Sequence, residues 1–128
     1  MRRPRSRDRG EVSTQIVILT PLLIPLVFLG VQSAIYFHAA NVASAAASQG
    51  AAAGSPVGAV AGDATAAATQ ILADLGATGG AEPSVIVGAG FVRVTVEVVV
   101  AHIVPFFPDM VQRTAVEPKE RFVPESDR

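Results

Sequence analysis

An uncharged apolar segment, Ile16 to Phe37 (IVILTPLLIPLVFLGVQSAIYF), constrains the fold of this chain more than any other feature. Roughly 20 apolar residues in a helix are needed to cross the ~30 Å hydrocarbon core of a bilayer, and this segment is long enough. The uncharged zone is wider still, because no Asp, Glu, Lys or Arg occurs from Val12 to Gly62. The sequence therefore predicts a single membrane-spanning helix, with membrane lipid as the first partner of the protein.

The residues that precede this segment are basic, with arginine at positions 2, 3, 5, 7 and 9 against one acid, Asp8. Because positive charge is retained on the cytoplasmic side of a membrane, residues 1–11 are expected to be a cytoplasmic leader. The C-terminal part would then lie outside the cytoplasm. No aromatic residue is interleaved with the arginines as in many nucleic-acid sites, so no nucleic-acid partner is expected.

A cleaved secretory signal is the alternative to a retained helix. The small residues Ala43-Ser44-Ala45 and Ala45-Ala46-Ala47 both resemble signal-peptidase sites. The apolar core of a signal is typically ~7–15 residues, however, and Ile16 to Phe37 is longer. The sequence favours a retained anchor, and the released module stays open as the alternative.

Residues 12–54 are predicted to form one helix that spans the membrane and continues outside it. The residues from Ala39 to Ala53 are rich in alanine, the best helix former. Pro21 and Pro25 lie inside the span and each removes a backbone donor, so a kink is expected near Thr20 to Pro25. The Thr20 hydroxyl is placed to bond to a freed carbonyl group.

Gly54-Ser55-Pro56 breaks this helix, and residues 55–76 are predicted to form a second, amphipathic helix. Ser55 would cap it, Pro56 would take its first position and Gly76 would end it. Its predicted apolar positions are Val57, Val60, Ala64, Ala67, Ala68, Ile71, Leu72 and Leu75, with Asp63, Gln70 and Asp74 on the opposite face. Glycines at 50, 54, 58 and 62 recur every four residues, which indicates either a helix-packing face or a coincidence of low complexity.

Residues 77–117 are predicted to form a small antiparallel meander. Val92, Val94, Val96, Val98 and Val100 alternate with Arg93, Thr95 and Glu97, as in a strand with one buried face. A short strand at 84–87 precedes it, Pro105 and Pro108 bracket a loop after it, and 110–117 would be the third strand. With a charged tail at 118–128, the expected architecture is a membrane-anchored, pilin-like α+β fold.

No catalytic constellation is apparent, so the chain is not expected to be an enzyme. It has no cysteine, and its two histidines, His38 and His102, lack companions with metal-ligand or triad spacing. Gly88-Ala89-Gly90 resembles half of a dinucleotide-binding fingerprint, but no helix follows it, so a hairpin turn is expected. Neither a metal nor another cofactor is predicted.

The order of these features resembles the TadE-like family, pseudopilins of tight-adherence (type IVb, Flp) pilus assembly. The resemblance is carried by Asp8-Arg9-Gly10, the apolar helix from Ile16 and the alanine-rich continuation AANVASAAASQGAAAG. The strand GFVRVTVEVVV and the proline-bounded loop after it support it.

The resemblance implies that a prepilin peptidase cuts after Gly10 and leaves Glu11 as the new N-terminus. The family glutamate five residues beyond the cut is replaced here by Gln15, whose amide offers neutral hydrogen bonds and no ion pair. The implied partners are the membrane assembly platform, a major pilin and other pseudopilins. Homo- or hetero-oligomers would form through the N-terminal helix.

The sequence thus predicts a non-catalytic accessory component of a tight-adherence pilus or a related secretion apparatus. It would be a single-pass protein of the cell membrane with a cytoplasmic N-terminus. The alternative is a secreted or free-standing membrane-anchored binding module unrelated to pili.

Overall fold

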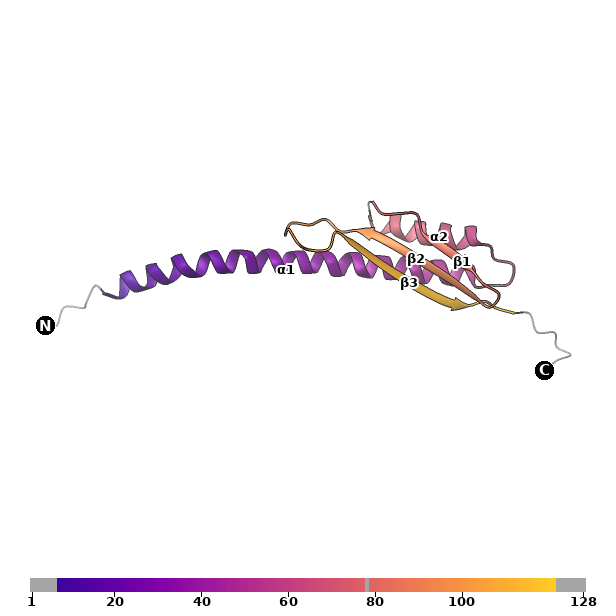
Figure 1. Cartoon of the computed structure of the whole chain (residues 1–128), viewed down its shortest axis with the longest axis horizontal. Coiled ribbons are helices and arrows are strands. Elements are labelled where there is room, and N and C mark those ends of the chain that lie inside the picture. The colour runs from indigo at the N-terminus through magenta and orange to yellow at the C-terminus, as the bar shows by residue number, and fades with distance from the viewer. Residues whose placement is uncertain (1–6, 78, 122–128) are drawn as a thin grey trace.

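A long helix with a small domain on its C-terminal half makes up the computed structural model, which describes residues 7–77 and 79–121. The elements are α1 (Arg7–Gly54), α2 (Ala61–Asp74), β1 (Ser84–Val87), β2 (Phe91–Val99) and β3 (Met110–Pro118). Figure 1 shows the first half of α1 as an arm that no other element touches, while α2 and the sheet gather along its second half. The predicted class, an α+β fold anchored by one long helix, is confirmed.

The first helix is longer than predicted, with 48 residues from Arg7 to Gly54 and a length of about 70 Å. It continues through Pro21 and Pro25, and the predicted kink there stays a prediction. The Thr20 hydroxyl donates a hydrogen bond to the Ile16 carbonyl at 2.7 Å. Pro21 leaves the Val17 carbonyl without its helical donor, so Thr20 bonds one residue before the carbonyl that it was expected to satisfy.

The two halves of α1 have opposite surroundings. Every residue from Thr14 to Val31 is exposed, and the Leu, Ile, Val and Phe side chains among them are between 44% and 70% exposed. From Gln32 onward one side of the helix is buried under α2 and the sheet. We call residues 14–31 the bare half and residues 32–54 the covered half. A helix that is apolar all round requires apolar surroundings, so the bare half has the properties of a membrane span.

Small side chains make the covered half of α1 a core element. Besides Gln32, its buried residues are Ala39, Ala40, Val42, Ala43, Ala46, Ala47, Gly50, Ala51 and Gly54. At 100° per residue these positions extend over about half of the circumference of the helix. The sheet and α2 can therefore both pack against the same stretch of backbone.

Two glycines of the four-residue series serve this packing within the chain. A Cβ atom on Gly50 would lie 2.9 Å from the Ala64 carbonyl oxygen, and one on Gly54 would lie 2.9 Å from Val92 Cγ1. Gly58 lies in the turn after α1, has a φ of +87° and has no atom within 4 Å of such a Cβ. The glycines therefore do not form one continuous packing face. Gly50 and Gly54 leave room for the close approach of α2 and β2, whereas Gly58 adopts the left-handed conformation that the turn requires.

The second helix starts later than predicted, because residues 55–60 form the turn that brings α2 back along α1. Val60 precedes its first turn, and its amide donates to Asp63 Oδ2 at 2.9 Å. The prediction that Ser55 caps α2 is wrong, since its hydroxyl donates to the Ala52 carbonyl at 3.1 Å. Pro56 accordingly lies in the turn and not in α2.

The end of α2 agrees with the sequence. Gly76 has a φ of +70°, its amide donates to the Ala73 carbonyl and the Ala77 amide donates to the Leu72 carbonyl. These two bonds form a Schellman motif, which a glycine in the left-handed region favours. Ala64 and Ala68 are buried, and the polar residues Asp63, Gln70 and Asp74 are exposed. Val57, Val60 and Leu75 lie just outside α2 and are exposed as well.

The sheet has the order β1-β2-β3 with antiparallel pairing throughout. The inner face is formed by the valines at 92, 94, 96, 98 and 100, each at most 4% exposed, together with Val111 and partly buried Val85 and Ala115. On the outer face, the hydroxyls of Thr95 and Thr114 lie 2.9 Å apart, and Gln112 donates to Glu97 at 2.8 Å. The sequence pattern predicts the central strand over Phe91 to Ala101, and β2 ends two residues earlier, at Val99. β3 ends at Pro118, one residue later than predicted.

Candidate functional site at the boundary between the halves of α1

Gln32 marks the point where the bare half of α1 meets the covered half. It is 0% exposed and is the one buried polar side chain among the residues whose side chains the structure describes. Its Oε1 accepts hydrogen bonds from the amides of Ile103 at 2.6 Å and Val104 at 3.4 Å. Its Nε2 donates to the Ala101 carbonyl at 3.3 Å. One amide side chain therefore fastens the connection between β2 and β3 to the helix.

This connection, residues 100–109, is the β2–β3 loop. The Val100 amide donates to the Asp109 carbonyl at 2.7 Å and closes the base of the loop. The ring of Phe107 meets the ring of Tyr36 edge-on, with centroids 5.6 Å apart. Figure 1 shows the loop as the part of the domain that reaches farthest along α1 toward the bare half.

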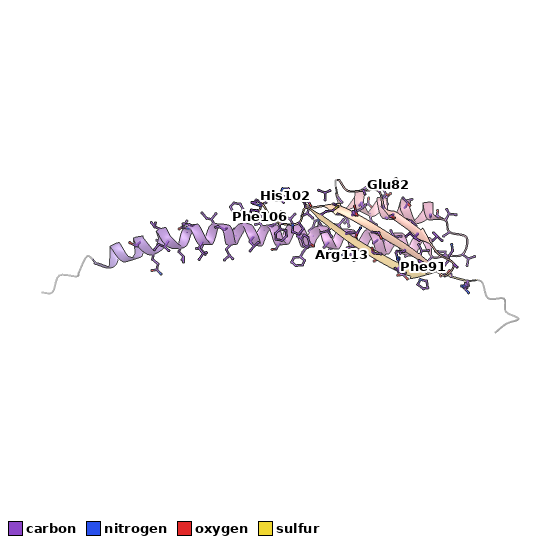
Figure 2. All side chains as sticks on the ribbon, viewed as in Figure 1. Glu82, Phe91, His102, Phe106 and Arg113 are labelled. Atoms are coloured by element: carbon purple, nitrogen blue, oxygen red, sulfur yellow. The ribbon has the colours of Figure 1, made fainter. Side chains whose placement is uncertain are left out.

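Phe106 lies in this loop and is fully exposed, at 103% of its reference area. Its φ is +77°, and it is the one non-glycine residue with a positive φ in residues 7–77 and 79–121. Figure 2 shows Phe106 and His102 at the end of the domain near the bare half, whereas Phe91 lies at the opposite end. The boundary thus combines an apolar helix surface, a fastened loop and an exposed aromatic ring.

The residues that the sequence associates with processing lie away from this boundary. Gly10 lies in the backbone of α1, and the side chain of Glu11 is outside the described side chains. Gln15 is exposed on the bare half, among residues that are all exposed. At 1.5 Å per residue, Gln15 lies about 25 Å along the axis from Gln32. The structure does not bring these residues together with Gln32.

The two histidines are separate and exposed. His38 borders a small open hollow between α1 and the end of α2, beside Ala39, Val42 and Leu75. Within the described residues, no three His, Cys, Asp or Glu side chains are grouped so that they could hold a metal ion. The boundary between the two halves of α1 therefore consists of exposed apolar side chains and of hydrogen bonds between Gln32 and the backbone of the β2–β3 loop.

Gln32 and Phe106 were missed by reasoning from the sequence. An amide within an otherwise apolar run and two consecutive phenylalanines between prolines (PFFP) were the available signals. Each is weak by itself, because a polar residue near a membrane surface and aromatic residues in a loop both have ordinary explanations.

Comparison with known proteins supports the resemblance of the N-terminal segment. The family model described as TadE-like protein matches residues 10–52, about a third of the chain. The match begins at Gly10 and ends two residues before α1 does, so it includes the bare half and nearly all of the covered half. It confirms the predicted TadE-like resemblance and suggests a role in tight-adherence pilus assembly. No curated protein and no solved structure matches the chain.

Proposed function

We propose that this TadE-like chain is a non-catalytic, pseudopilin-like accessory component of a tight-adherence pilus or a related secretion apparatus. The observation that carries the proposal is the family match over α1, the helix that is both a bare apolar span and a core element of a small domain. The bare half offers a surface on all sides to lipid and to neighbouring helices. Its partners would be the assembly platform, a major pilin and other pseudopilins.

Deletion of the gene tests this role directly. We expect loss of sheared surface fibres or of secretion through the apparatus, with recovery when the full chain is restored. Normal fibres and normal secretion in the deletion strain would contradict the proposal and favour a free-standing membrane-anchored binding module.

The buried alanines of α1 support a retained helix over a module released by signal peptidase. Ala43, Ala46 and Ala47 are at most 1% exposed in the core. Cleavage between residues 43 and 47 would cut α1 within the domain and remove the buried residues Ala39, Ala40 and Val42. Cleavage after Gly10 removes no residue of the core.

The proposed orientation places the N-terminus in the cytoplasm and the domain outside it. The N-terminal arginines support it through the retention of positive charge on the cytoplasmic side. A reporter that is active only in the cytoplasm should be silent when fused after Arg128 and active when fused before Met1. The opposite pattern would refute the orientation.

We further propose that a prepilin peptidase processes the chain between Gly10 and Glu11. Mass spectrometry of the membrane-bound protein should show a new N-terminus at Glu11 in a strain with the peptidase and at Met1 in a strain without it. An intact Met1 terminus in both strains would refute the processing step.

In this proposal, Gln15 lowers the efficiency of assembly into fibres and not the efficiency of cleavage by the peptidase. Gln15→Glu should raise recovery in sheared fibres without changing the extent of processing, because a carboxylate can form an ion pair within the membrane and an amide cannot. Gln49→Glu, the same change at an exposed position of the covered half, should leave recovery unchanged. Equal recovery of the Gln15→Glu variant and the original chain would contradict a role for residue 15 in a fibre.

A further inference from the structure

We propose that the β2–β3 loop is a second membrane contact, in which Phe106 and Ile103 insert into the lipid interface on the side of the bilayer where the domain lies. The domain would then rest on the membrane surface and not swing freely on α1. This inference requires that α1 crosses a membrane, but it depends neither on the orientation of the chain nor on a role in pili.

The position of the loop along α1 is the first support. The bare half from Thr14 to Val31 is about 27 Å long, close to the ~30 Å thickness of a hydrocarbon core. If the bare half spans the hydrocarbon core of the bilayer, the boundary between hydrocarbon and headgroups lies near Gln32. The hydrogen bonds from Gln32 to residues 101, 103 and 104 hold the loop at this same level.

The chemistry of the loop is the second support. No Asp, Glu, Lys or Arg occurs from Val100 to Pro108, and Ile103 is 51% exposed beside the fully exposed Phe106. On α1 at this level, Phe37 is 65% exposed and packs edge-on against Tyr36. Four of the seven aromatic residues in the chain therefore gather here: Tyr36, Phe37, Phe106 and Phe107. Tyrosine is enriched at membrane–water interfaces, and exposed phenylalanine is typical of the apolar face of segments that lie in the interface.

The backbone of the loop limits how deep it can lie. Irregular backbone is not tolerated in hydrocarbon, because its polar groups would lose their hydrogen bonds to water. We therefore place the backbone of residues 101–108 in the headgroup region, with the side chains of Phe106 and Ile103 directed into the upper part of the acyl chains.

The conformation of Phe106 is the third support. A bulky residue with φ near +77° is strained, and glycine would adopt this turn at lower cost. Strained residues persist where the surroundings or a function require them. The ring of Phe106 is fully exposed, so no contact within the chain favours this conformation, and the bare half of α1 extends from the same end of the domain (Figure 2).

The sequence provides a clean test, because the chain contains no tryptophan. Phe106→Trp places a single fluorophore in the loop, and Phe91→Trp places one at the opposite end of the domain (Figure 2). Each full-length variant is reconstituted in nanodiscs that hold one copy, with lipids brominated either near the carbonyl end or near the methyl end of the acyl chain. We expect the Phe106→Trp emission to be blue-shifted and quenched several-fold more than that of Phe91→Trp, and more strongly by bromine near the carbonyl end.

Equal quenching of the two variants would overturn the proposal. A blue shift of Phe106→Trp without quenching by brominated lipid would also overturn it, because the ring would then be packed against protein. The absence of cysteine allows a second measurement with nitroxide labels on Phe106→Cys and Phe91→Cys. Protection of the label at 106 alone from a water-soluble paramagnetic reagent supports insertion, and equal accessibility of both labels contradicts it.

Discussion

Gln32→Leu should release the β2–β3 loop from α1 while leaving the helix and the sheet in place. Leucine has a similar size but can neither accept from the amides of Ile103 and Val104 nor donate to the Ala101 carbonyl. The hydrophobic core that joins the sheet and α2 to the covered half does not include Gln32.

The magnitude follows from the three hydrogen bonds. The bond from the Ile103 amide is short at 2.6 Å, whereas those that involve Val104 and Ala101 are long at 3.4 Å and 3.3 Å. A buried polar group that loses its partner costs about 1–3 kcal/mol, and the two long bonds contribute little. We therefore expect the free energy of loop opening to fall by about 2 kcal/mol, which corresponds to roughly a 30-fold rise in the open population.

Amide hydrogen exchange measures this opening locally. A peptide that includes residues 101–107 should exchange roughly 30-fold faster in Gln32→Leu, with the same exchange as before in β2. Gln49→Leu is the matched control, because Gln49 is exposed on the same helix and the chemical change is the same. An unchanged rate of amide exchange in the loop of Gln32→Leu, or an equal rise of this rate in Gln32→Leu and Gln49→Leu, would refute the conclusion that Gln32 holds the loop on α1.

Two further predictions concern the core. Gly50→Ala should lower the free energy of unfolding, measured by thermal unfolding, by about 1 kcal/mol. Overpacking costs about 1–3 kcal/mol, and the higher helix propensity of alanine offsets up to ~1 kcal/mol of this cost. Gly62→Ala should instead raise the free energy of unfolding in the same assay, because its Cβ would meet only Val60 Cγ2 at 3.9 Å. Val94→Asp should unfold the domain because a buried unpaired charge costs several kcal/mol, whereas Thr95→Asp should lose about 1 kcal/mol with its hydrogen bond to Thr114. Equal proteolytic sensitivity of the two aspartate variants would contradict the assigned faces of β2.

Local patterns were sufficient for the elements of this fold. The uncharged run and the alanines after it predicted one continuous helix, because both properties act within a few residues. The alternating valines predicted a strand with one buried face, since successive side chains point to opposite sides. Gly76 predicted the end of α2, because a glycine in the left-handed region completes a Schellman motif.

The start of α2 and the role of the glycines could not be predicted in this way. Ser55-Pro56 is a good local start for a helix, but residues 55–60 are needed to turn the chain so that α2 can lie along α1. The spacing of Gly50 and Gly54 indicates that another segment packs closely against α1, but it does not identify that segment. The partner is within the chain, because Ala64 and Val92 occupy the space that a side chain at these positions would need.

Gln15 and Gln32, both in α1, show what separates a pattern in sequence from a contact in space. Gln15 is conspicuous because a family position expects glutamate there, whereas Gln32 has the appearance of a solvated residue at the end of an apolar run. Gln32 is buried only because residues 69 to 72 positions away fold back onto it. No periodicity within α1 can reveal such a contact. Because the contact fixes the β2–β3 loop at the end of the bare half, the polar side chain that joins this loop to α1 is one that its local sequence does not mark.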